Sequence, residues 1–218
     1  MKTNKLYTLL MTLLTALTLL SASIALPILC RSFYYLHIGP LELEEKTGLT
    51  EAQIRTAYDE MMDFCLGGGE FSTGELAWSE SGKHHFEDVR ALFLLDLRIL
   101  AVCAPLLLLL PILARRKGWT ASRPLGRGPS FWAGAGLAGS FLLVGGLASL
   151  DFDRAFILFH TLFFPGKTNW IFDWRVDEII LILPQTFFRN CAILILATLV
   201  AGCAALMAAD LRRARKRP

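Results

Sequence analysis

Residues 6–29 read LYTLLMTLLTALTLLSASIALPIL and contain no charged side chain. The hydrocarbon core of a bilayer needs about 20 apolar residues in a helix, so this stretch is long enough to cross it. Three more stretches have a similar length and character, at about residues 91–113, 131–150 and 179–209. The sequence therefore predicts an all-α membrane protein, a single integral membrane domain of residues 1–218 with four transmembrane helices.

The composition supports this fold class. The chain of 218 residues is 54% hydrophobic and 19% charged, with a net charge of +3. Intrinsic disorder requires few apolar residues and a high net charge, so it is excluded. A cleaved signal peptide ending near Ala25 is the alternative to a retained first span. Signal peptides have an apolar run of about 7–15 residues, and the longer run here favours retention.

The distribution of lysine and arginine predicts the orientation of the spans. Twelve basic residues lie before residue 6, in the loop 114–130 and in the tail 210–218. Short cytoplasmic segments collect basic residues, so we expect both termini and this loop in the cytoplasm. The segments 30–90 and 151–178 contain twelve and five acidic residues and are expected at the outer face. A membrane anchor explains the basic tail, so no nucleic-acid partner is expected.

The first outer segment is predicted to contain a surface helix. Thr50 and Gln53 have the spacing of a capping box, which begins a helix that extends to about Cys65. Its apolar side chains share one face at helical spacing. They are Ile54, Ala57, Tyr58, Met61 and Met62. We expect this stripe to pack on the rest of the outer segment or on the membrane, and a partner protein is the alternative. Cys30 and Cys65 lie on the same side, and the sequence leaves a disulfide between them open.

A second helix is predicted to begin at Ser79 or Ser81 and to continue into the second span. His85 would lie in its first turn, where the positive end of the helix dipole favours the neutral imidazole that a general base needs. Asp88 follows three residues later on the same face and is expected to orient the ring of His85.

The second outer segment contains an apolar stretch, residues 155–164, that is too short to span the membrane. It is predicted to be interfacial or re-entrant, and its only ionisable side chain is His160. By topology alone, His85 and His160 lie at the same outer membrane face. Two histidines in such settings indicate a candidate catalytic site.

The motifs of both outer segments resemble those of the Lit family, the bacterial lipoprotein intramolecular transacylases. The matching residues are Thr47-Gly48-Leu49-Thr50 with Ile54 and Tyr58-Asp59, Ser79-Glu80, His85-Phe86, Asp88-Val89, Phe159-His160, Phe163-Phe164, Trp170, Asp177, Ile179-Ile180, and Pro184 with Phe187-Phe188. The pattern differs at Trp174 and at Ala77-Trp78. This resemblance implies a membrane O-to-N acyltransferase of the bacterial cell membrane with its active site at the outer face.

The implied substrates are diacylglyceryl-modified lipoproteins, embedded among membrane lipids. The enzyme would move the sn-2 ester acyl chain to the α-amino group of the N-terminal Cys, giving the lyso form without an acyl-enzyme. His85 and His160 would move the protons, and which of them is the base stays open. The expected supporting residues are Asp88, Asn169, Trp170, Asp173 and Asp177, with Asn169, Asp173 or a backbone N–H at the oxyanion. The expected acyl-chain contacts are Phe156, Phe159, Phe163 and Phe164. Neither a metal nor a cofactor is expected.

Two alternatives belong to other functional classes. The first is a non-catalytic membrane interaction protein that docks a partner through the stripe around Tyr58. The second is a metal-dependent membrane hydrolase that uses His84, His85, Asp88 and His160. The shared-site hypothesis makes one geometric demand: the two catalytic histidines must lie within about 12 Å of each other to serve one reaction.

Overall fold

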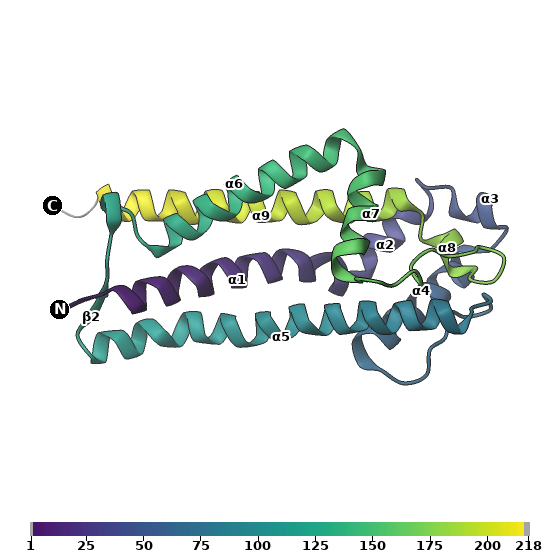
Figure 1. Ribbon diagram of the computed structural model, residues 1–218, viewed down its shortest axis with the longest axis horizontal. Helices are drawn as coiled ribbons and strands as arrows, with labels where there is room; N and C mark the ends of the chain where they lie inside the picture. The colour runs from purple at the N-terminus through teal and green to yellow at the C-terminus, as the bar shows by residue number, and fades with distance from the viewer. Residues whose placement is uncertain (1, 216–218) are drawn as a thin grey trace. The chain divides into compact units, whose positions relative to one another are not determined.

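The computed structural model describes residues 2–215 and is almost entirely helical. Four of its helices are long and apolar enough to cross a membrane: α1 (Lys5–Leu29), α5 (Glu80–Arg116), α6 (Pro129–Leu150) and α9 (Gln185–Arg215). Figure 1 shows these four as the long rods of the ribbon. The prediction of four spanning helices in an all-α membrane protein is confirmed. Lys216 and Arg217 of the predicted tail lie outside the described residues.

One helix boundary agrees with the sequence prediction and one differs. The second spanning helix begins at Glu80, directly after Ser79, which confirms the predicted helix that starts before the apolar span and continues into it. The fourth stretch does not begin as one helix at residue 179. A short helix, α8 (Ile179–Ile182), comes first, and α9 begins only after Pro184. Proline lacks the N–H that would continue the helix and disfavours helical backbone at the residue before it, which explains the break.

The chain divides into two compact units, and the first comprises Met1–Ala25, Asp96–Ser149 and Leu194–Pro218. Glycines in α6 allow its close contact with α9: a Cβ at Gly134 would lie 3.0 Å from the carbonyl oxygen of Cys203, and one at Gly145 would meet Leu196. The sequence had not indicated the short parallel pair of β1 (Lys2–Asn4) and β2 (Trp119–Ala121) in this unit. The buried Asp210 carboxylate accepts hydrogen bonds from Arg123, at 2.9 and 3.1 Å, and from the backbone of Gly128.

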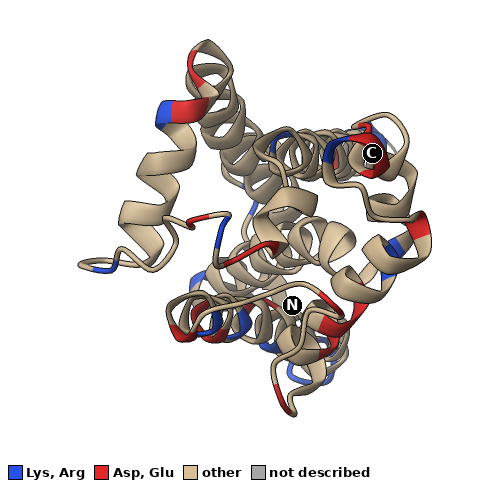
Figure 2. Ribbon diagram, turned by 90° about the vertical axis from the view of Figure 1, so that its right-hand side faces the viewer, with Lys and Arg blue, Asp and Glu red and all other residues tan. Residues whose placement is uncertain are grey.

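The second unit comprises Leu26–Leu95 and Leu150–Ile193. Besides α8 it contains α2 (Arg31–Ile38), α3 (Leu43–Thr47), α4 (Glu51–Gly67) and α7 (Phe152–Phe163). The capping box predicted at the start of α4 is present, with both of its hydrogen bonds. In Figure 2 the end of the ribbon that carries this unit faces the viewer, and acidic residues, in red, lie on several of its loops and helix ends.

Aromatic stacking forms the core of this unit. The rings of Tyr34 and Tyr58 stack with their centroids 3.7 Å apart, and Phe187 packs edge-on against Tyr34 with 5.1 Å between centroids. The hydroxyl of Tyr34 donates to the carbonyl of Ile182 at 2.8 Å, at the break before α9. Burial raises the pKa of Tyr34 well above its usual value. The stripe of α4 is therefore part of the core, with Tyr58 only 3% exposed, and it is not available as a docking surface. Cys30 and Cys65 are both free thiols.

Candidate active site

His85 of α5 and His160 of α7 lie side by side in the second unit. Their ring centroids are 5.9 Å apart, well inside the distance that a shared reaction centre demands. Both side chains are buried, with 6% and 8% of their surface exposed. Ser79 caps α5 by accepting a hydrogen bond from the backbone of Gly82, so His85 lies in the second turn of the helix instead of the first.

Aromatic rings enclose the two imidazoles. Phe164 and Phe172 approach His85 edge-on, at 5.0 and 5.4 Å between centroids. Phe156 lies 4.3 Å from His160, and Trp170 stacks on the same imidazole at 4.7 Å. A charged imidazolium would lose its hydration in such a setting, and the rings therefore favour the neutral form.

The protonation states follow from this burial. His85 precedes the apolar part of α5, which begins at Ala91, and α7 is not a spanning helix. Burial, reinforced by the neighbouring His160, lowers the pKa of His85 to about 4. Burial also lowers the pKa of His160. Both histidines are therefore neutral at physiological pH.

The tautomer of His160 is defined by its own helix. Its Nδ1 lies 2.8 Å from the carbonyl oxygen of Phe156, one turn earlier. A carbonyl oxygen can only accept, so Nδ1 carries the proton and Nε2 keeps its lone pair in the neutral ring. Nδ1 of His85 is buried and has no hydrogen-bond partner within the described residues. His160 is thus prepared to act as a base through Nε2.

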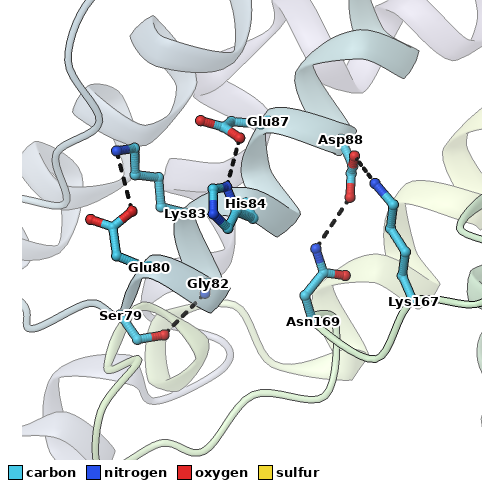
Figure 3. Close-up of polar contacts among 9 residues, drawn as sticks. All are labelled: Ser79, Glu80, Gly82, Lys83, His84, Glu87, Asp88, Lys167 and Asn169. Atoms are coloured by element: carbon cyan, nitrogen blue, oxygen red, sulfur yellow. Dashed lines mark hydrogen bonds and ion pairs between the residues drawn. The ribbon is translucent and has the colours of Figure 1, made fainter.

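Asp88 does not orient His85 through a hydrogen bond, contrary to the sequence interpretation. Its carboxylate accepts hydrogen bonds from Nζ of Lys167, at 2.5 Å, and from Nδ2 of Asn169, at 3.2 Å (Figure 3). Partial burial by itself would raise the pKa of Asp88, but these two donors outweigh it and hold the pKa below its usual value. Asp88 is therefore ionised, and it acts on His85 by its charge alone.

The remaining predicted polar residues separate into different positions. Trp170 covers His160 and donates its indole N–H to the carbonyl of Lys167 at 3.0 Å. The amide NH₂ of Asn169 donates one of its two N–H groups to Asp88, and its Oδ1 is a free acceptor. Asp173 is exposed and accepts from the backbone of Arg175 in its own loop.

Asp177, unlike Asp173, is buried. It lies in the segment before α8, and its carboxylate contacts the start of α5. It accepts hydrogen bonds from the backbone and the hydroxyl of Ser79, at 2.8 and 2.9 Å. This contact connects the segment before α8 to the cap of the helix that carries His85. In this position Asp177 supports the site from outside the aromatic enclosure.

The four phenylalanines predicted to contact acyl chains have two different environments. Phe159 and Phe163 pack against each other at 4.6 Å and are 46% and 47% exposed, as lipid-facing rings would be. Phe156 and Phe164 belong to the wall around the imidazoles, which Phe159 also meets through an edge-on contact with His160 at 5.4 Å between centroids. Sequence reasoning did not single out Phe172 or Lys167. Lys167 is one of only three basic residues in the acidic segment 151–178, and this contrast is the sequence signal that could have identified it as an ion-pair partner.

The four residues of the metal alternative do not form one cluster. His84 faces away and its Nδ1 lies 2.8 Å from Glu87, an exposed pair visible in Figure 3. Within residues 2–215, no three His, Cys, Asp or Glu side chains lie together as a metal site requires.

The comparisons with known proteins agree with this architecture. Residues 9–188 match the family described as "Lipoprotein intramolecular transacylase Lit". The fold is similar to the structure of the membrane integral lipoprotein intramolecular transacylase Lit from Bacillus cereus, with a TM-score of 0.85 and 21% identity, covering 97% of this chain and 95% of that one.

Two further structures of the Bacillus cereus protein carry a histidine replaced by arginine or by alanine. Their TM-scores are 0.77 and 0.75, at 21% and 22% identity, and they cover 98% and 96% of this chain and 94% of each of theirs. The comparison with curated proteins found no match. Because the family match extends over most of its length, the chain belongs to the Lit family of lipoprotein intramolecular transacylases and is a membrane-integral acyltransferase.

Proposed function

We propose that this chain transfers the sn-2 ester acyl group of a diacylglyceryl lipoprotein to the α-amino group of that lipoprotein's N-terminal Cys. The product is the N-acylated, lyso-form lipoprotein. The observation that carries the proposal is the pair of buried, neutral imidazoles whose centroids lie 5.9 Å apart. Two such groups provide one base and one hydrogen donor for a single reaction centre.

The substrate contains both reactants, so the reaction needs no acyl-enzyme. Holding an amine and an ester of one molecule in contact replaces a bimolecular encounter. This can lower the activation barrier by about 7–11 kcal/mol. The protein's main tasks are then to hold the lipid and to move protons. The half-exposed rings of Phe159 and Phe163 offer apolar surface for acyl chains at the edge of the site.

The protons balance with two histidines in different roles. The ammonium loses two protons in total, one released to solvent and one that ends on the glycerol oxygen. His160 takes the proton from the attacking nitrogen through Nε2, because its Nδ1–H is bonded to Phe156. His85 gives a proton to the departing glycerol oxygen and regains it from His160. Each such general acid or base contributes roughly 10²–10⁴-fold to the rate.

The site is proposed to face outward, where membrane-tethered lipoproteins reside. Support comes from the acidic segments 30–90 and 151–178, which provide both histidines, and from the basic loop 114–130. Short basic segments remain cytoplasmic, so the two outer segments lie on the opposite side.

The test is expression in a bacterium whose lipoproteins carry the diacylglyceryl group and a free amine, followed by mass spectrometry of N-terminal lipopeptides. The wild-type chain should convert them to the lyso form, whereas His85→Ala and His160→Ala should each abolish conversion with normal membrane insertion. His84→Ala is the matched control, because this exposed neighbour lies outside the aromatic enclosure. Unchanged lipoproteins with the wild-type chain would refute the function, and full conversion by either variant would remove that histidine from the mechanism.

A further inference from the structure

The carboxylate of Asp88 is bound to a primary ammonium from its own chain. Nζ of Lys167 donates to one oxygen and the amide of Asn169 to the other, and both residues come from the loop that follows α7 (Figure 3). Asp88 lies three residues after His85 on α5, one helical turn away. The contact between Lys167 and Asp88 therefore lies next to the proposed reaction centre.

Two polar atoms on residues that interact with this carboxylate have no partner. Oδ1 of Asn169 and Nδ1 of His85 are both fully buried and make no hydrogen bond to any described residue. The side chain of His85 is only 6% exposed. A buried polar atom without a partner costs about 1–3 kcal/mol, and such atoms are rare in native proteins and concentrate where a ligand, an ion or a catalytic role accounts for them. Oδ1 of Asn169 is an acceptor, and Nδ1 of His85 is one in the tautomer that carries its proton on Nε2, so the pair points to a hydrogen-bond donor.

The chemistry of the three groups defines that donor. A carboxylate, an amide oxygen and an unprotonated imidazole nitrogen are all acceptors, and the carboxylate is negatively charged. A primary ammonium has three N–H donors and one positive charge, so it can satisfy all three groups. Lys167 shows that the carboxylate already binds a group of this kind, and its side chain is 49% exposed, which leaves it free to move into solvent.

We propose that Asp88, Oδ1 of Asn169 and Nδ1 of His85 form a binding site for the α-ammonium of the substrate, and that Lys167 occupies Asp88 until the substrate displaces it. This inference rests on the proposed function and specifies how that site recognises its acceptor. Binding through Nδ1 leaves the proton of His85 on Nε2, in agreement with its role as the donor to the glycerol oxygen.

The site also distinguishes the substrate from the product. After transfer the nitrogen is an amide, with no charge and one N–H, and it can no longer satisfy three acceptors. Lys167 then returns to Asp88, and the product is released. A lipoprotein that is already N-acylated is rejected for the same reason.

The test measures binding of a lipopeptide with an S-dialkylglyceryl group, whose ether bonds cannot donate an acyl chain, to the full-length protein in lipid nanodiscs. One probe has a free α-amine and the other is N-acetylated. The wild-type protein should bind the free amine at least tenfold more tightly. Asp88→Asn should remove this preference, whereas Glu87→Gln, the neighbouring carboxylate that pairs with His84, should retain it.

A gain of affinity separates the proposal from simple misfolding. Lys167→Met removes the internal competitor, so the free amine should bind several-fold more tightly while the N-acetylated probe is unaffected. Equal affinity of the two probes for the wild-type protein, or a preference retained in Asp88→Asn, would overturn the ammonium site. If the wild-type chain converts lipoproteins while either result holds, only the ammonium site fails. Absence of both conversion and probe binding would overturn the proposed function as well.

Discussion

His85 should remain neutral at a pH where an ordinary histidine is half protonated. Its pKa is lowered from 6.5 to about 4, and each pH unit corresponds to about 1.36 kcal/mol, so charging this ring in the folded protein costs about 3 kcal/mol. The sign is clear: between pH 6.5 and 4 the unfolded chain binds more protons than the folded one. The contribution of His85 to the free energy of unfolding is therefore constant above pH 6.5 and becomes progressively less favourable to the folded state as the pH falls toward 4.

The assay is NMR of the imidazole nitrogens in protein labelled with ¹⁵N-histidine. The signals of His85, identified by their loss in His85→Gln, should keep the pattern of a neutral ring at pH 5.5. Phe164→Ala removes a ring that lies 5.0 Å from His85 and admits water. Because burial is the largest cause of the shift, this variant should raise the pKa of His85 by about one unit or more. A wild-type midpoint at pH 6 or above would refute the electrostatic argument.

Three substitutions test the supporting structure by thermal unfolding in detergent. Gly82→Ala places a Cβ against the carboxylate of Asp177, and such overpacking should destabilise the protein by about 1–3 kcal/mol and lower lipoprotein conversion; a wild-type Tm would contradict this. Tyr34→Phe leaves the carbonyl of Ile182 without its donor, for a loss of about 1–3 kcal/mol, and an unchanged Tm would show that this hydrogen bond is unimportant. Asp210→Ala leaves a partly buried arginine unpaired and should lower the stability by about 3–5 kcal/mol, while conversion per folded molecule stays the same; a change in that rate would connect this pair to the reaction.

The spans and the two histidines could be identified from the sequence because the length and hydropathy of a segment predict whether it crosses a bilayer, and the basic residues predict which side its ends face. The same reasoning predicted the capping box of α4, a local signal of two residues. It extended the fourth span back to residue 179, because hydropathy does not register the helix break that Pro184 causes. The pairing of β1 with β2 joins residues more than a hundred positions apart, and strands of three residues give no pattern.

Hydrogen-bond partners in the candidate site were harder to predict than the residues themselves. The spacing of His85 and Asp88 correctly indicates a shared helix face, but it does not reveal that Lys167 and Asn169 compete for the same carboxylate. Lys167 reaches Asp88 from a loop 79 positions later, and the position of that loop depends on tertiary packing. Composition likewise grouped the phenylalanines of α7 together, whereas the fold divides them between the wall of the site and exposed surface.

The hydrogen bond between Nδ1 of His160 and the carbonyl of Phe156 has an evolutionary consequence. Where a carboxylate side chain orients a catalytic histidine, a single mutation can remove it. His160 is oriented by main-chain atoms one turn earlier in its own helix, and every amino acid at position 156 supplies that carbonyl. Drift at that position can alter the wall of the site without changing the tautomer of the base. The helical backbone thus orients the base. Relatives can vary in sequence near His160 without losing this orientation, as long as this turn remains helical.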